Sequence, residues 1–310
     1  MEIAKINKSK AVFDDLYATD DPRDYFSVLG ALDYVIPDVA ESVIRQILSA
    51  RGARYRSETN ILDVGCSYGI NAALHRFPVN FSTLRQRYAR REMMEVPPAE
   101  MVRLDRNFYA SWPDVGLAKF IGFDVSEPAI RYANEVGLHI DGVATNLETK
   151  ELSHREAEII APANVILSTG AVGYVTDRTY QKLLDAMAGV PWIISFVLRM
   201  FPYDGFIKAF AEREMVTEKL PGTTFVQRRF RDAEEFEKTL AALEMRGIDP
   251  HGVEGDGLFQ AELFLSRPEA DAKAMSLEEI VTVSSGRFGS FGARYVQVEQ
   301  RDGPKTAMEA

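Results

Sequence analysis

The chain has 310 residues, of which 46% are hydrophobic and 26% are charged, and its formal net charge is −10. This size and composition predict an ordinary soluble globule with a full core, and no run approaches the ~20 apolar residues of a membrane span. An acidic balance does not favour a nucleic-acid-binding protein, which usually carries a basic surface. The single cysteine excludes an internal disulfide and a cysteine-cluster metal site, and no metal is expected.

Residues 1–57 precede the first predicted strand. The first residues lack the apolar core of a signal peptide, so a cytoplasmic location is expected. Residues 16–26 form a turn-rich, aromatic opening. Apolar residues then recur at helical spacing over 39–48, and Gly52 lies where such a helix would end, so a helix is predicted here.

A short apolar run at 61–64 leads into Gly65 and Gly69, and a segment of helical character begins at Asn71. The pattern predicts a strand, a tight turn and the start of a helix. Glycines permit left-handed or crowded backbone, and they let a ligand approach the main chain. Small ligands of open α/β sheets bind at such strand ends.

Several chemistries share this outline. A dinucleotide fingerprint would need glycine at the positions of Ser67 and Ile70, and a phosphate loop would need a Gly-Lys-Ser/Thr run that the chain lacks. Residues 65–69 match the G-x-S-x-G nucleophile elbow literally, but that elbow follows several strands and an oxyanion loop. A plain glycine turn without a ligand is the remaining alternative.

The chain departs from a minimal α/β fold between residues 77 and 118. In dinucleotide-binding folds the acidic residue that contacts the ribose lies ~20 residues beyond the glycine turn. The candidate here, Asp124, lies 61 residues after Asp63 (124 − 63). About forty residues are therefore inserted, and they predict short helices at 82–89 and 98–104. Such an insertion could select a substrate, or it could serve a homodimer.

Further strands and helices alternate along the rest of the chain. Repeated βα units closed by a late antiparallel strand at 258–265 predict an α/β fold: a doubly wound, Rossmann-like, mostly parallel seven-stranded sheet with a helical N-terminal segment and inserted helices. The tail either adds a strand at 295–298 or stays mobile. The remaining strands are predicted at 120–125, 143–147, 163–168, 192–198 and 223–227, and the helices at 126–133, 176–187 and 232–246.

The run Asp63-Val64-Gly65-Cys66-Ser67-Tyr68-Gly69 resembles motif I of the class I S-adenosylmethionine-dependent methyltransferases, an acidic residue followed by G-x-G-x-G. Ser67 stands in place of the middle glycine. A strand tipped by Asp124 and another ending at Asn146 follow in the family's order, and the resemblance covers most of residues 58–268.

The resemblance implies a division of the chain into three parts. Residues 1–57 would form an N-terminal helical lid segment, although simple packing on the sheet is the alternative. Residues 58–268 would form the methyltransferase domain, with insertions at about 77–118 and 200–230. Residues 269–310 would be a C-terminal extension that is partly flexible.

The resemblance also implies S-adenosylmethionine as cofactor and assigns its contacts. The carboxylate of Asp124 would accept the ribose hydroxyls, Val125 and Leu147 would lie against the adenine, and Asn146 would bind its edge. Capping of a helix by Asp124 and stabilisation of a turn by Asn146 are the alternatives. The methionine end and the sulfonium would be held by Asp63, Gly65, Cys66, Ser67, Gly69, Ser168 and Thr169.

The function implied is in-line transfer of a methyl group to a small-molecule acceptor. The chain lacks the Asn/Asp-Pro-Pro-aromatic signature of nucleic-acid amino methyltransferases, and the arginines at 85–91 and 228–231 are predicted to lie on solvated faces. A methyltransferase acting on protein or RNA, and a catalytically inactive protein that keeps the fold, are the alternatives. No catalytic residue is identified, and the candidate substrate contacts are Tyr17, Tyr25, Tyr174 and Tyr203.

Overall fold

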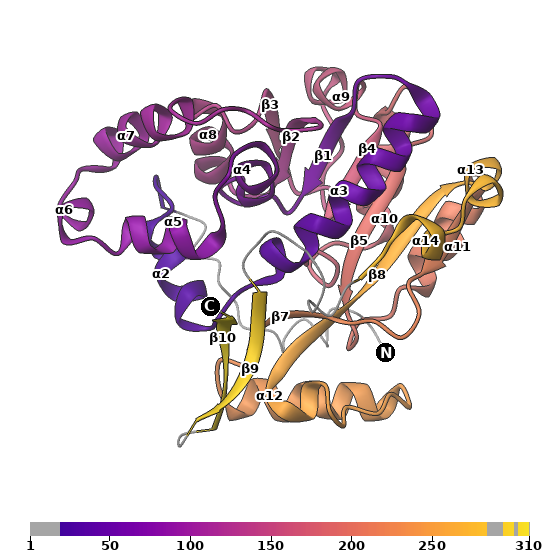
Figure 1. Cartoon of the computed structure of the whole chain (residues 1–310). Helices are drawn as coiled ribbons and strands as arrows, with labels where there is room; N and C mark the ends of the chain where they lie inside the picture. The colour runs from indigo at the N-terminus through magenta and orange to yellow at the C-terminus, as the bar shows by residue number, and fades with distance from the viewer. Residues whose placement is uncertain (1–18, 284–293, 301–302, 310) are drawn as a thin grey trace.

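A computed structural model of the chain describes residues 19–283, 294–300 and 303–309. Helices and strands alternate along most of the chain, as the sequence predicts (Figure 1). The helices are α2 (Arg23–Ala31), α3 (Ile36–Tyr55), α4 (Ile70–Arg76), α5 (Phe81–Tyr88), α6 (Arg91–Met94), α7 (Pro98–Ala110), α8 (Glu127–Glu135), α9 (His154–Ile160), α10 (Asp177–Ala186), α11 (Asp204–Ala211), α12 (Ala233–Met245), the 3-10 turn η2 (Glu254–Asp256), α13 (Glu269–Ala274) and α14 (Leu277–Ile280). The strands are β1 (Asn60–Val64), β2 (Lys119–Asp124), β3 (Asp141–Ala144), β4 (Val165–Ser168), β5 (Trp192–Leu198), β6 (Met215–Lys219), β7 (Phe225–Arg229), β8 (Leu258–Pro268), β9 (Arg294–Gln300) and β10 (Gly303–Glu309).

The main sheet has the order β3-β2-β1-β4-β5-β8-β6, and its first five strands are parallel. From β1 the chain runs outward to β2 and β3, and it then returns past β1 to β4 and β5. Because parallel crossovers are right-handed, this reversal places the connecting helices on opposite faces of the sheet. The predicted doubly wound, mostly parallel sheet is confirmed. The reversal also opens a crevice at the carboxyl ends of β1 and β4, where ligands of such sheets bind.

The late strand β8 is antiparallel to its neighbours, as the alternating pattern predicts. It pairs with β5 on one side and with both β6 and β7 on the other. Strand β6 pairs along the C-terminal half of β8 and β7 along its N-terminal half, so β7 is an eighth strand beside the seven of the main path. The tail strand predicted at 295–298 is β9, and it forms a separate two-stranded sheet with β10.

The N-terminal helix α2 begins at Arg23, inside the segment predicted to be turn-rich. Pro22 precedes it, and the fixed φ of proline suits the start of a helix. The longer helix α3 confirms the helix predicted over 39–48, and it packs against α4 and β7. Among the described residues no helix is both long enough and apolar enough to cross a membrane.

The segment between α4 and β2 forms the three helices α5, α6 and α7, which extend as an arm to the left of Figure 1. The predicted helices at 82–89 and 98–104 correspond to α5 and α7. Helix α2 packs on this arm, because Phe26 stacks on Tyr88 at 4.8 Å and lies 5.1 Å from Phe81 between ring centroids. The inserted helices therefore support α2 through α5.

Candidate functional site

The turn after β1 is held in a conformation that depends on its glycines. Gly65 and Gly69 have φ values of +73° and +81°, and the intervening Ser67 is also left-handed at +49°. A Cβ atom at Gly65 would lie 2.7 Å from the Cβ of Ala171, so only glycine fits there without a shift of its neighbours. The turn thereby approaches the loop after β4 closely.

Asp124 ends β2 directly beside this turn. Its Oδ2 accepts a hydrogen bond from the main-chain N–H of Ser67 at 2.9 Å, and its Oδ1 accepts one from the N–H of Ser126 at 3.0 Å. Burial raises the pKa of its carboxyl, and these N–H donors act in the opposite direction. The carboxylate thus joins two strand ends and orders the turn before α8, whose N-cap is Ser126 and not Asp124.

A cavity of about 420 Å³ lies against both features, within the size range of small-molecule sites. Its lining comes from α2, from the carboxyl ends of β1, β2 and β4, from the segment after β3, and from β7. The predicted site residues that line it are Gly65, Ser67, Asp124, Val125, Asn146, Leu147, Thr169, Tyr25 and Tyr174. The other lining residues are Leu29, Tyr34, Ile70, Phe123, Thr145, Glu148, Gly170, Ala171, Val175, Thr179, Gln227 and Arg228.

Asn146 lies beyond the end of β3, which ends three residues earlier than the strand predicted at 143–147. Its side-chain Oδ1 accepts from the N–H of Glu148 at 3.0 Å, so it stabilises the local turn while it also faces the cavity. Glu148 in turn accepts from the hydroxyl of Thr176 at 2.8 Å and from that of Thr179 at 2.6 Å. The segment after β3 is thereby fixed to the start of α10.

Asp63 is fully buried behind the turn and does not line the cavity. Its Oδ1 accepts from the amide of Asn71 at 2.9 Å, and that amide also donates to the Thr169 hydroxyl at 3.1 Å. Its Oδ2 has no hydrogen-bond partner in the described ranges. Burial raises the pKa of this carboxyl to about 7. Asn71, which the sequence reasoning missed, therefore connects the ends of β1 and β4.

Other predicted residues lie outside the cavity lining. Cys66 and Ser168 are buried, and burial raises the pKa of the Cys66 thiol, which favours the unreactive protonated form. Gly69 begins α4. The ring of Tyr203 is stacked on Phe206, and its hydroxyl donates to Ser195 at 3.0 Å, inside the core. Tyr17 lies outside the described residues.

His75 and His139 are buried away from the cavity lining. Burial lowers the pKa of each imidazole to about 3, so both are neutral near pH 7. Neither side chain is placed to exchange a proton with a molecule in the cavity.

The arginine run at 228–231 is not the uniformly solvated face that the sequence predicts. Arg228 is only 2% exposed, and its terminal nitrogens donate to both carboxylate oxygens of Glu235 at 2.7 and 2.8 Å. Its guanidinium also lies 4.8 Å from the ring centroid of Phe259. Arg229 and Arg231 are exposed, as predicted. Arg228 is buried because β7 has a bulge here: its register against β8 shifts between Val226 and Arg228.

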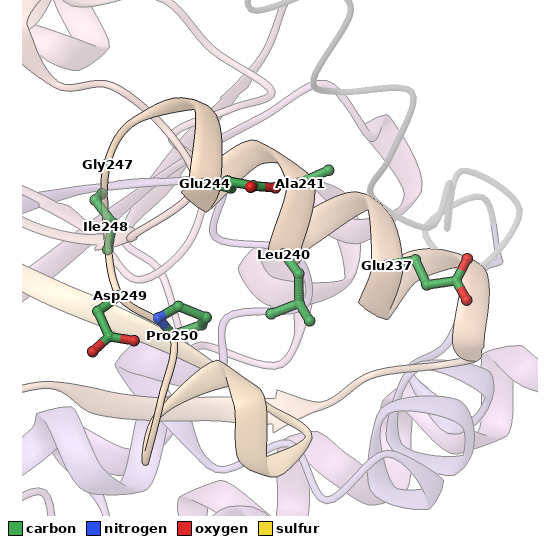
Figure 2. A pocket seen from close by; sticks show the side chains of 8 residues that line it. All are labelled: Glu237, Leu240, Ala241, Glu244, Gly247, Ile248, Asp249 and Pro250. Atoms are coloured by element: carbon green, nitrogen blue, oxygen red, sulfur yellow. The ribbon is translucent and has the colours of Figure 1, made fainter.

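A second hollow lies on α12 and the turn that follows it. Figure 2 shows Leu240 of α12 pointing toward Pro250 of that turn, with acidic side chains at the rim. The lining residues are Glu237, Leu240, Ala241, Glu244, Gly247, Ile248, Asp249 and Pro250. No strand end contributes a polar group to this hollow. The cavity at the carboxyl ends of the strands is therefore the candidate site.

Comparison with known proteins gives structural likenesses of low identity. No family model matches the chain, and no curated protein matches it. The plantazolicin methyltransferase BpumL, solved in complex with a triazolic desmethylPZN analog and SAH, shares 15% identity at a TM-score of 0.42, over 86% of this chain and 98% of its own. A TehB-like SAM-dependent methyltransferase from Corynebacterium glutamicum shares 13% identity at a TM-score of 0.35, over 71% of this chain and 86% of its own. A functionally unknown protein from Deinococcus radiodurans R1 shares 14% identity at a TM-score of 0.36, also over 71% of this chain and 86% of its own.

Proposed function

We propose that this chain is an S-adenosylmethionine-dependent methyltransferase that acts on a small-molecule acceptor. The observation that carries the proposal is the position of Asp124. Its carboxylate ends β2 and accepts the main-chain N–H of Ser67 within the glycine turn after β1, and both residues line one cavity. This position matches the order of the motifs that the chain shares with class I methyltransferases.

The residues present fit the parts of that cofactor. The carboxylate of Asp124 has acceptor positions beyond the two N–H groups that it already binds, and these suit ribose hydroxyls. Val125, Asn146 and Leu147 would hold the adenine, since they follow the next strand ends along the same cavity. The glycine turn offers main chain without side-chain obstruction for the methionine end, and Asp63 lies behind it with one oxygen that has no partner among the described residues.

S-adenosylmethionine supplies an electrophilic methyl group on a sulfonium. The task of the chain is therefore to bind donor and acceptor in line and to exclude water, and orientation of this kind is worth ~7–11 kcal/mol of barrier. The donor end is formed by the strand ends, and the acceptor end by Tyr25, Tyr34, Tyr174 and β7. Since the buried histidines lie elsewhere, positioning is the main contribution that we assign to the protein.

Calorimetric titration with S-adenosylhomocysteine tests this proposal. We expect one molecule to bind per chain, and Asp124→Asn to weaken binding at least ~10-fold because a hydrogen bond to a charged group contributes ~1.5–3 kcal/mol. The control is Asp141→Asn, a change of the same kind at the opposite end of β3, which should bind like the wild type. Absence of binding by the folded wild type at millimolar ligand would refute the proposal.

A further inference from the structure

Gln227, a largely buried glutamine on β7, lies at the acceptor end of the cavity. Gln227 is 4% exposed and belongs to the cavity lining. Its Nε2 lies against Gly170, directly after β4, where an added Cβ would come within 2.6 Å of this nitrogen. Gly170 thus leaves room for the amide beside the strand end that would border the methyl donor.

The main chain of Gln227 is fixed from two sides. Its carbonyl oxygen accepts from the N–H of Val35 at 2.9 Å, and the N–H of Arg229 donates to the carbonyl of Leu32 at 2.8 Å. On its other edge β7 pairs with β8. The loop between α2 and α3 and the sheet together hold this strand in place. The side chain of Gln227 therefore begins from a defined backbone position.

The side-chain amide of Gln227 makes no hydrogen bond to any residue within 19–283, 294–300 or 303–309. Its amide atoms are not among the fully enclosed side-chain atoms that lack a partner, so they reach the open space of the cavity. Because the amide borders the cavity, a molecule bound there can supply the missing partner. A primary amide both donates and accepts, so that partner can be a hydroxyl, a carbonyl or a ring nitrogen.

The surroundings of Gln227 indicate the charge and shape of this partner. The neighbouring cation, Arg228, donates two hydrogen bonds to the carboxylate of Glu235. Its charge is therefore already neutralised by a side chain of the protein and does not call for an anionic ligand. The remaining walls at this end include the rings of Tyr25 and Tyr34, whose centroids are 6.5 Å apart, and of Tyr174. Aromatic walls favour a planar ring over a flexible charged chain.

We propose that Gln227 determines acceptor specificity, by hydrogen-bonding a polar group on an uncharged, planar aromatic molecule bound against the wall that the tyrosines form. The proposal rests on the methyltransferase function, because it places this molecule beside the methyl donor. It adds a residue outside the cofactor motifs and a chemical class for the acceptor.

The test uses three naphthalene probes of one ring size: neutral 2-naphthol, anionic 2-naphthoate and cationic 2-naphthylmethylamine. Each is titrated into the full chain with and without saturating S-adenosylhomocysteine, at pH 7. With S-adenosylhomocysteine bound, we expect 2-naphthol to bind at least ~10-fold more tightly than either charged probe, because a charged group would lose hydration beside Gln227 and the tyrosines, where the neighbouring charged side chain, Arg228, is already paired with Glu235. Tightest binding of 2-naphthoate, or no binding of any probe, would overturn the proposal.

Two variants separate a specific role of Gln227 from a structural one. Gln227→Met keeps the length and removes the amide, and it should weaken 2-naphthol ~10-fold while affinity for S-adenosylhomocysteine stays within about twofold. Gln227→Glu should shift the preference toward the cationic probe, which a merely structural change would not do. Val226→Thr, a neighbour on β7 outside the cavity lining, is the matched control.

Thermal unfolding of every variant confirms that it is folded. Unchanged affinity of folded Gln227→Met for 2-naphthol would overturn the proposal. If S-adenosylhomocysteine fails to bind the wild type while the probe series behaves as expected, the methyltransferase function fails and the ligand specificity of Gln227 stands. The two failures are therefore distinguishable.

Discussion

Asp63 shows how a single residue can couple the candidate site to the stability of the core. Its carboxyl is enclosed behind the glycine turn, with one oxygen bonded to Asn71 and the other without a partner in the part of the chain described. Burial disfavours the charged form and raises the pKa to about 7, against 3.8 for an ordinary aspartate. Between these two pH values the folded chain holds a proton that the unfolded chain has released.

This pKa shift predicts a particular dependence of stability on pH. The free energy of unfolding contributed by Asp63 should fall as the pH rises from about 4 to about 7, because the folded state binds more protons there. Asp63→Asn keeps an acceptor oxygen for Asn71 and removes the titration. In urea unfolding, the stability of the variant relative to the wild type should therefore increase from pH 5 to pH 8.

The comparison isolates Asp63, since both proteins keep His75 and His139. The lowered pKa values of those histidines reduce stability in acid equally in the two proteins. Stability profiles of wild type and variant that run parallel from pH 5 to pH 8 would show that Asp63 does not titrate in this window.

At the scale of elements, the inserted helices act as a support for α2. No residue of α5, α6 or α7 lines the cavity, whereas Tyr25 and Leu29 of α2 do. Phe26, between them, faces the arm and stacks on Tyr88. The insertion therefore affects the site through the placement of α2, and a direct contact with the acceptor is not needed to explain it.

A buried cluster around Asp105 holds this arm together. Its Oδ1 accepts from Arg87 at 2.8 Å, and its Oδ2 accepts from the hydroxyls of Tyr88 and Tyr132 at 2.9 and 2.8 Å. The side chain of Asp105 is 0% exposed, and the cluster joins α5, α7 and α8. These bonds fix the arm to the helix that follows β2.

Asp105→Ala should lower the free energy of unfolding by about 3–5 kcal/mol, because it leaves the arginine and two tyrosine hydroxyls without their shared acceptor. Glu100→Ala, on the same helix, removes an exposed ion pair with Arg103 and should leave stability almost unchanged, because solvent screens exposed charges. Denaturant unfolding of both variants measures the difference. An equal effect of the two changes would contradict the role given to this cluster.

Sequence patterns predicted the elements whose form depends on local residues. The order of strands, the glycine turn and the placement of Asp124 beside it follow from hydrophobic periodicity and from the rule that parallel strands end at one edge. Tyr203 was a poorer candidate, because the segment after β5 turns its ring into the core against Phe206.

The part of the cavity wall that β7 forms could not be predicted in this way. A strand normally alternates between its faces, yet both Gln227 and Arg228 are buried because β7 carries a bulge at this point. The bulge and the hydrogen bond from Val35 depend on contacts far apart in the sequence. A single sequence therefore showed only a charged run where the structure has a buried amide and a buried ion pair.

On the scale of the whole molecule, the cavity exists only where distant parts of the chain meet. Helix α2, the ends of β1, β2 and β4, and β7 each contribute one part of its wall. The charge of the protein is acidic overall, and the lining contains the carboxylates of Asp124 and Glu148. A donor that carries a sulfonium and an ammonium suits such surroundings.

The most direct test of this account asks whether the carboxylate of Asp124 binds the sugar of the donor. Calorimetry would compare S-adenosylhomocysteine with its 2′-deoxy analogue, on the wild type and on Asp124→Ala. We predict that the wild type binds the analogue ~10-fold more weakly than S-adenosylhomocysteine and that the variant binds the two ligands equally. Without the carboxylate, neither ligand can make the hydrogen bond that the 2′-hydroxyl provides. Equal discrimination by the two proteins would contradict the account.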